Sequence, residues 1–221
     1  MSQEQWTAVD RYFSDQLVPH DPTLEAALKA SADAGLPPIN VSPTQGRLLH
    51  LLARLQGARK ILEIGTLGGY STIWLARALP EDGHLVTLEA LAKHARIAEA
   101  NIANAGLADI VEIRVGAALD TLPKLAEEGK GPFDLTFIDA DKERIPEYFR
   151  WALEMSRPGS VVIVDNVVRG GAVTDAATSD PDVKGVRRFL ELLASEPRVT
   201  GTAIQTVGSK GWDGLALAVV N

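Results

Sequence analysis

Short apolar segments alternate with stretches of helical character from residue 60 to the end of the chain. The apolar segments predict strands at residues 60–64, 84–89, 110–115, 133–139, 160–165, 199–205 and 215–220. The stretches between them predict helices at residues 71–79, 90–105, 118–128, 144–156 and 183–195. A chain that repeats the order strand, helix, strand folds into a mostly parallel sheet with helices on both faces. The sequence therefore predicts an α/β fold.

The two ends of the chain depart from this repeat. Only residues 206–214 join the last two predicted strands, which is enough for a hairpin but too short for a parallel crossover. We therefore expect an antiparallel last strand. Residues 2–16, 23–34 and 43–56 are expected to be helical, the third with Ser42 as N-cap and Gly57 as its stop. The expected organisation is one domain over residues 1–221, with an N-terminal helical extension at 1–57 and the core at 58–221.

Charge and composition exclude several classes of function. The 221 residues carry a net charge of −7 and no basic block, so a nucleic-acid partner is not expected. There is no cysteine, which excludes disulfides, thiolate metal sites and a cysteine nucleophile. The charged N-terminus lacks the apolar core of a signal peptide, and no apolar run reaches membrane-spanning length. These features predict a cytoplasmic protein without a membrane partner.

Two neighbouring predicted strands end in oxygen-bearing side chains. Residues 133–139 end in Asp139, and residues 160–165 end in Asp165, which Asn166 follows. Ligands of an open parallel sheet bind at the carboxyl ends of its strands, so we expect these three side chains to converge on one divalent cation. A donor set made only of oxygen selects Mg²⁺ or a similar hard ion, and it does not separate Mg²⁺ from Mn²⁺ or Ca²⁺.

A lysine follows the first of these carboxylates on the turn that leaves the strand. The neutral form of a lysine is favoured beside a divalent ion, so Lys142 is suited to act as a general base toward a substrate hydroxyl. The alternative is a surface ion pair among Asp139, Asp141 and Lys142, with Asp165 and Asn166 forming a turn or cap. Their joint position after adjacent strands favours the functional interpretation, for which Asp141 is not needed.

A glycine-rich turn at residues 65–69 connects the first strand of the core to a helix. Leu67 stands where the second glycine of a dinucleotide fingerprint would be, which argues against a pyrophosphate site. Glu63 near the end of the first strand is suited to accept from an ammonium group, and Glu89 at the end of the next is suited to hold ribose hydroxyls. Together they suit S-adenosylmethionine, a nucleoside with an amino-acid tail and no phosphates. The alternative is a structural turn without a ligand.

Three segments carry a resemblance to a known family: residues 63–71, Ile138-Asp-Ala-Asp-Lys142 and Asp165-Asn-Val-Val-Arg-Gly-Gly171. The chain resembles the cation-dependent class I O-methyltransferases, which include catechol and caffeoyl-CoA O-methyltransferases, in their bacterial branch. The resemblance implies a Rossmann-like, seven-stranded, mostly parallel sheet with an antiparallel last strand and a commonly homodimeric protein. It also implies Lys142 and Asp139 as catalytic residues and a metal site of Asp139, Asp165 and Asn166. The implied contacts to S-adenosylmethionine are Val41, Glu63, Gly65, Thr66, Ser71, Glu89, Ala118 and Asp139.

The leading hypothesis is a Mg²⁺-dependent O-methyltransferase that acts on a vicinal dihydroxy aromatic, a catechol-like phenolic small molecule. One alternative is a nicotinamide-dependent oxidoreductase, against which Leu67 counts. The other is a non-catalytic nucleoside-binding protein, against which the complete set of metal ligands and base counts. The segments 1–36 and 167–182 vary within the family, and they leave the natural acceptor and its regiochemistry open.

Overall fold

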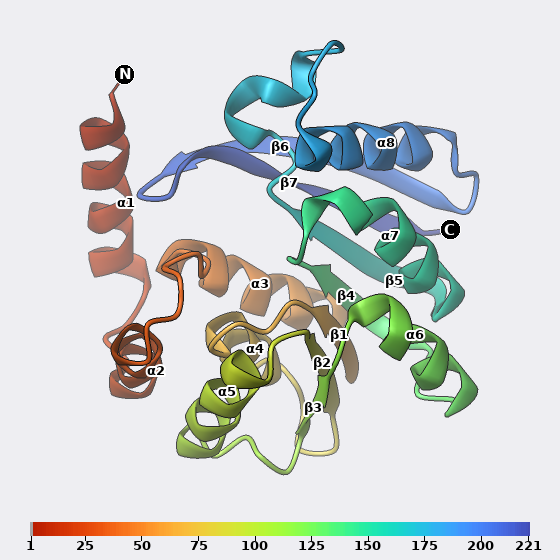
Figure 1. Ribbon diagram of the computed structural model, residues 1–221. Coiled ribbons are helices and arrows are strands. Elements are labelled where there is room, and N and C mark those ends of the chain that lie inside the picture. Colours follow the sequence, from red (N-terminus) through yellow and green to blue (C-terminus); the bar gives the residue numbers. More distant parts are fainter. Residues whose placement is uncertain (1) are drawn as a thin grey trace.

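The computed structural model describes residues 2–221, which form a seven-stranded sheet with helices on both faces (Figure 1). The strand order is β3-β2-β1-β4-β5-β7-β6, and β7 runs antiparallel to both of its neighbours. The predicted fold class and the antiparallel last strand are thereby confirmed. The strands are β1 Lys60–Ile64, β2 His84–Glu89, β3 Val111–Val115, β4 Phe133–Ile138, β5 Ser156–Asp165, β6 Val199–Gly208 and β7 Gly211–Val220.

The helices divide between the two faces of the sheet, and each face has its own apolar core. Neighbouring residues of β1 alternate between the cores: Ile61 packs with α2 to α5, and Leu62 packs with α6 to α8. Full burial of one such side chain contributes roughly 1.5–3 kcal/mol. The helices are α1 Gln3–Leu17, α2 Pro22–Asp33, α3 Pro43–Gln56, α4 Tyr70–Ala76, α5 Ala92–Asn104, α6 Ala118–Glu127, α7 Ile145–Glu154 and α8 Pro181–Ser195, with short 3-10 turns η1 Lys142–Arg144 and η2 Arg169–Thr174.

Helix α3 starts and ends at the predicted residues. The Ser42 hydroxyl accepts from the backbone N–H of Gln45 at 3.2 Å, and Pro43 occupies the first turn. Gly57 ends the helix in the left-handed conformation, with φ of 66°. The start of α3 is thereby fixed beside the carboxyl ends of the central strands, where its first turn reaches β5 through a hydrogen bond between Gln45 and Asp165.

The last two strands are longer than predicted. β6 and β7 pair from Val199↔Val220 to Gly208↔Gly211, so the nine-residue join expected at 206–214 shrinks to a tight hairpin tip. Gly211 takes a φ of 98° at this tip, a value that favours glycine. Most of β6 is exposed, so its sequence lacks the apolar alternation that marks a half-buried strand. The extra residues of β6 could therefore not be predicted from the amino-acid pattern.

The segment 167–182 contains the short 3-10 turn η2. Its beginning is held by Asp213 of β7, whose Oδ1 accepts from the backbone N–H groups of Val168 at 2.9 Å and Arg169 at 3.1 Å. Trp212 packs on Gly171 so closely that a Cβ there would lie 2.8 Å from the indole ring. The segment is therefore anchored to β7 next to the end of β5.

No helix within residues 2–221 combines the length and the apolar character needed to cross a membrane.

The order of the strands reverses at the centre of the sheet. β1 pairs with β2 on one side and with β4 on the other, so the chain crosses to opposite sides after β1 and after β3. A crevice forms outside the carboxyl ends of the strands at such a point, and ligands of open α/β sheets bind there. Glu63, Glu89 and Asp139 all belong to strand ends around this crevice.

Candidate active site

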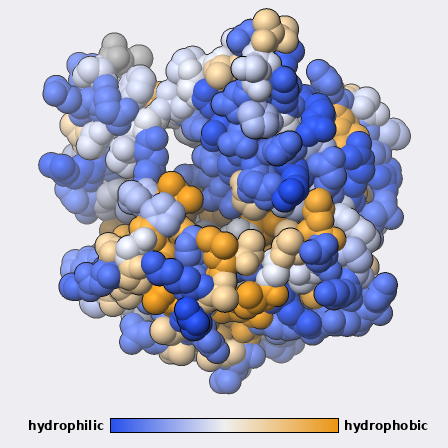
Figure 2. All heavy atoms as spheres, in the orientation of Figure 1, coloured by the Kyte–Doolittle hydropathy of each residue, from blue (hydrophilic) through white to orange (hydrophobic). Residues whose placement is uncertain are grey.

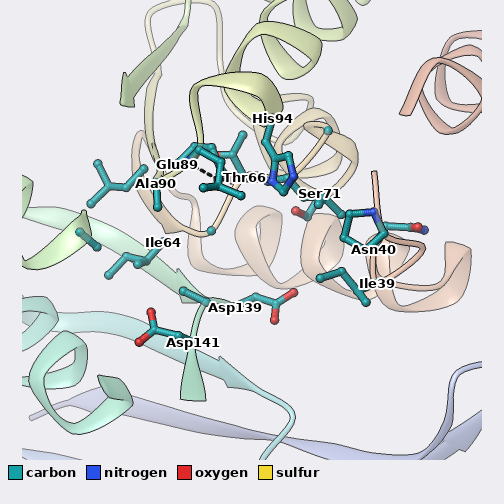
Figure 3. Close-up of a pocket in the computed structure, with 18 of the residues that line it drawn as sticks. Ile39, Asn40, Ile64, Thr66, Ser71, Glu89, Ala90, His94, Asp139 and Asp141 are labelled. Carbon is teal, nitrogen blue, oxygen red and sulfur yellow. Dashed lines mark hydrogen bonds and ion pairs between the residues drawn. The ribbon is translucent and has the colours of Figure 1, made fainter. Parts of the chain in front are cut away.

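A cavity of about 950 Å³ opens at the carboxyl ends of β1, β2 and β4. Apolar side chains gather in the middle of the face in Figure 2, and hydrophilic side chains surround them. Figure 3 shows the cavity in close-up, with Glu89 and His94 on one wall and Asp139 across from them. The Asp139 carboxylate points toward the side where Ile39 and Asn40 lie. The cavity therefore joins the glycine-rich turn to the acidic end of β4.

The glycine-rich turn brings its backbone close to the end of β4. Gly65 has a φ of 101°, and a Cβ on it would lie only 2.0 Å from the carbonyl oxygen of Asp139. Gly69, with a φ of 82°, is the N-cap of α4. A side chain at Gly65 would push apart β1 and β4, so glycine is required there for steric as well as conformational reasons.

Glu89 fixes this turn from the end of β2. One carboxylate oxygen accepts from the backbone N–H of Leu67 at 2.8 Å, and the other accepts from Leu91 at 2.9 Å. The Nδ1 atom of His94 lies 3.5 Å from the same carboxylate. Leu67 has a φ of 51°, an uncommon conformation for a leucine, which its bond to Glu89 stabilises. Glu89 and His94 both line the cavity, where an acidic side chain is suited to accept from ribose hydroxyls.

Glu63 lies behind the cavity rather than on its wall. Its carboxylate is fully buried and accepts from the hydroxyls of Ser71 at 2.7 Å, Thr72 at 2.5 Å and Thr87 at 2.7 Å. Burial raises its pKa to about 7; the three hydroxyls oppose this rise, and the Asp139 charge adds to it. Among residues 2–221 no lysine, arginine or histidine forms a salt bridge with Glu63. A cation bound in front of Ser71 would compensate this charge.

The remaining predicted cofactor contacts lie together on the cavity wall. They come from the entry to α3, the glycine-rich turn, the start of α4, the start of α6 and the end of β4. The Thr66 hydroxyl is buried and lies 2.6 Å from that of Thr87, which also donates to Glu63. The predicted cofactor contacts that line the cavity are Val41, Gly65, Thr66, Ser71, Glu89, Ala118 and Asp139. Of the predicted set, Glu63 alone reaches the cavity indirectly, through Ser71.

Lys142 and Asp139 form an ion pair at the edge of the cavity. The Nζ atom of Lys142 donates to Oδ1 of Asp139 at 2.7 Å, and the lysine side chain is only 8 % exposed. The bond spans the turn between β4 and η1, so the two side chains are held together by a local feature of the chain. Both groups line the cavity. A primary amine is thereby held where a hydroxyl-bearing ligand would enter.

Asp165 ends β5 beside this pair. Its Oδ1 atom accepts from the backbone N–H of Asn166 at 2.8 Å, and its Oδ2 atom accepts from Nε2 of Gln45 at 2.6 Å. Burial and, after it, the Asp139 charge raise the pKa of Asp165 to about 7, against the opposing effects of Lys142 and of the hydrogen bonds from Asn166 and Gln45. Asn166 has a φ of 60°, a conformation that asparagine tolerates, and it lines the cavity. The predicted metal ligands and the predicted base therefore lie at one edge of the sheet.

The donor set at this edge fits a hard divalent cation. The Lys142 ammonium pairs with Asp139, and burial first and the Asp139 charge second raise the pKa of Asp165, so negative charge gathers at the ends of β4 and β5. Within residues 2–221 no three His, Asp or Glu side chains cluster as metal ligands, so the set consists of two carboxylates and the Asn166 amide. Oxygen donors of this kind suit Mg²⁺, which commonly keeps several waters.

Several residues in the cavity or next to it were not predicted from the sequence. Asp141, which was interpreted as not functional, lines the cavity and accepts from the Tyr148 hydroxyl at 2.5 Å. Burial and Asp141 together raise the pKa of Tyr148. His94 also lines the cavity, beside Glu89. Gln45 has its partner on β5, and no local motif signals such a contact.

Comparison with known proteins places this site in a family. A family model described as "O-methyltransferase" matches residues 14–219. A catechol O-methyltransferase from Niastella koreensis is 53% identical over 220 residues, which cover 100% of both chains. The structure of an O-methyltransferase from Bacillus cereus in complex with SAH has a TM-score of 0.99 and 60% identity, and the match covers 100% of both chains.

A third protein adds a second bound ligand. The O-methyltransferase TomG from Streptomyces achromogenes, solved in complex with SAM, has a TM-score of 0.97 and 58% identity, and the match covers 100% of this chain and 99% of TomG. The family match spans most of the chain, and these identities are well above those at which only a fold is shared. The chain therefore belongs to the O-methyltransferase family of methyl-transferring enzymes.

Proposed function

We propose that the protein transfers the methyl group of S-adenosylmethionine to a hydroxyl of a catechol-like aromatic, with help from a bound divalent cation. The observation that carries the proposal is the pair of Lys142 and Asp139, held at 2.7 Å on the wall of the cavity that the glycine-rich turn also lines. The side of the cavity that suits the nucleoside and the side that carries Lys142, the proposed general base, thus meet at the end of β4. The names of the relatives support both the reaction type and the catechol acceptor.

The turn side of the cavity suits the cofactor. S-adenosylmethionine, when bound, supplies the methyl group on a positively charged sulfur. Glu89 is suited to accept from the ribose hydroxyls, and the start of α6 at Ala118 is suited to lie against the adenine. Ser71 and the buried charge of Glu63 behind it favour the ammonium of the amino-acid tail. The SAH and SAM complexes of the Bacillus and Streptomyces relatives support this assignment.

The other side suits a flat phenolic acceptor. Pro37, Pro38 and Ile39 belong to the cavity wall. Ile39 lies on the side toward which the Asp139 carboxylate points (Figure 3), so an aromatic ring can pack there. Asp139, Asp165 and Asn166 would hold the divalent cation. When bound there, such an ion supplies Lewis acidity and a fixed place for two adjacent hydroxyl groups.

Lys142 performs the proton transfer in this proposal. Its Nζ atom takes the proton from one acceptor hydroxyl, and Asp139 holds the amine at the cavity wall before and after the transfer. The acceptor oxygen then forms its bond to the methyl carbon while the carbon–sulfur bond breaks, which leaves S-adenosylhomocysteine and a methyl ether. Charge is lost in this step, so catalysis depends mainly on positioning and on an anionic oxygen.

The test of this proposal is methyl transfer from labelled S-adenosylmethionine to a panel of phenols in the presence of Mg²⁺. We expect catechol and other vicinal diols to be methylated and simple phenols and resorcinol to react at least about 100-fold more slowly, since only vicinal hydroxyls share one cation. Equal rates for catechol and phenol contradict the substrate class. Tight binding of NADH in calorimetry supports the oxidoreductase alternative, and cofactor binding without any product supports the non-catalytic one.

We further propose that the protein is a homodimer, in keeping with the resemblance. Helix α1 buries none of its residues in the monomer, and it exposes Val9, Tyr12, Phe13 and Leu17. Such an apolar surface on a single helix suits a protein interface. Light scattering should give twice the chain mass of 23.6 kDa, and Tyr12→Ser with Phe13→Ser should halve it. A wild-type monomer at tens of micromolar protein contradicts the proposal.

A further inference from the structure

Within residues 2–221, Gln45 makes the only side-chain hydrogen bond between α3 and the acidic end of β5. Its Nε2 atom donates to Oδ2 of Asp165 at 2.6 Å, across 120 positions of the chain. The glutamine is half-buried, and Asp165 is 4 % exposed. A charge-assisted hydrogen bond of this length in a water-poor setting is among the stronger polar contacts a protein makes.

The two oxygens of Asp165 are held by separate donors. Oδ1 accepts from the backbone N–H of Asn166, and Oδ2 accepts from Gln45. The first bond lies within the chain turn after β5, so it fixes only one edge of the carboxylate. The second comes from a different helix, and it therefore sets the rotation of the carboxylate about its own axis.

We propose that Gln45 is a positioning residue that orients Asp165 for the divalent cation. The inference rests on the proposed metal site of Asp139, Asp165 and Asn166. Carboxylates that ligate metals are in turn hydrogen-bonded by neighbouring groups, and removal of such a group typically costs 10–100-fold in metal affinity. Gln45 donates through an amide that carries no charge, so it orients the carboxylate without competing with a cation for it.

Hydrogen bonds hold the first turn of α3, which carries Gln45. Its backbone N–H donates to the Ser42 hydroxyl at 3.2 Å, and Ser42 contacts the Thr44 hydroxyl at 3.0 Å. Thr44 donates to Asp10 of α1 at 3.0 Å, and Asp10 accepts from Ser209 in the β6–β7 tip at 2.7 Å. The first turn of α3 is thus tied to α1 and to the hairpin, and it presents Gln45 to Asp165 from a fixed base.

The experiment is a titration of the metal-free protein with Mn²⁺, followed by the EPR signal of the free ion. Gln45→Met keeps the length of the side chain and removes the donor, so we expect the dissociation constant for Mn²⁺ to rise about 10–100-fold. Gln45→Asn keeps the amide but shortens its reach, and we expect a similar loss. Affinity for S-adenosylmethionine and the melting temperature in EDTA should stay near the wild-type values.

Gln56 offers a matched control on the same helix. Its Nε2 atom donates to the backbone carbonyl of Gly159 at 2.7 Å, at the other end of α3. Gln56→Met should bind Mn²⁺ like the wild type. If the wild type binds Mn²⁺, Asp165→Ala loses it and both Gln45 variants match the wild type, the role of Gln45 is disproved while the metal site stands. A wild type that binds no Mn²⁺ overturns the metal site and this inference together.

Discussion

Replacing Lys142 with methionine is expected to lower kcat for catechol methylation by about 10²–10⁴-fold, the usual contribution of a general base. Methionine nearly matches the length of the lysine stem but cannot accept a proton. The cavity wall on the cofactor side is formed by other residues, so the KM for S-adenosylmethionine should change little. Single-turnover assays with labelled cofactor separate the methyl-transfer step from product release and give this ratio directly.

Two further variants separate proton transfer from simple charge pairing. Lys142→Arg keeps a cation beside Asp139, but a guanidinium stays protonated and cannot serve as a base, so kcat should remain low. Lys124→Met removes an exposed lysine on α6 and should leave the rate unchanged. A Lys142→Arg enzyme with at least half of the wild-type kcat would show that the lysine acts only through its charge.

The alternation of strands and helices was enough to predict the sheet. Apolar segments such as 60–64 and 133–138 are buried on both faces, so their composition alone marks them as inner strands of a parallel sheet. The antiparallel β7 followed from the length of its join to β6. The ends of these two strands could not be predicted. β6 is an exposed edge strand, and such a strand places no constraint on the polarity of its residues.

In the site, contacts between residues close in sequence could be predicted, and contacts between distant elements could not. Asp139 and Lys142 lie three positions apart, and Asp165 and Asn166 are neighbours, so a short motif identifies each pair. The contact of Gln45 with Asp165 joins separate elements of the fold and leaves no such mark. Glu63 was predicted only in part. Its position near the strand end could be read from the sequence, but its three hydroxyl partners could not.

Loss of the divalent cation is expected to have the largest effect of all. Without it, Asp139 on the cavity wall and the buried Asp165 behind it keep their negative charge beside the Lys142 ammonium, and an anionic acceptor oxygen would be repelled. Asp139→Asn and Asp165→Asn each remove one anionic donor, so both should weaken Mn²⁺ binding and lower the rate by at least about 100-fold. Binding of S-adenosylmethionine should survive in Asp165→Asn, because Asp165 does not line the cavity.

Asp141→Asn is the matched control for these two variants. Asp141 lies two residues after Asp139 and lines the same cavity, but it pairs with Tyr148 rather than with Lys142. We expect this variant to keep wild-type affinity for Mn²⁺. A loss equal to that of Asp139→Asn would assign the ion to a different set of carboxylates.

The most direct measurement is the rate of catechol methylation by the wild-type protein before and after removal of divalent cations. EDTA followed by desalting should reduce product formation to the background without enzyme, and added Mg²⁺ should restore it in a saturable way. Binding of S-adenosylmethionine, measured by calorimetry in EDTA, should persist and show that the protein remains folded. Undiminished turnover after complete metal removal would contradict the account, because the proposed cation would then have no part in the reaction.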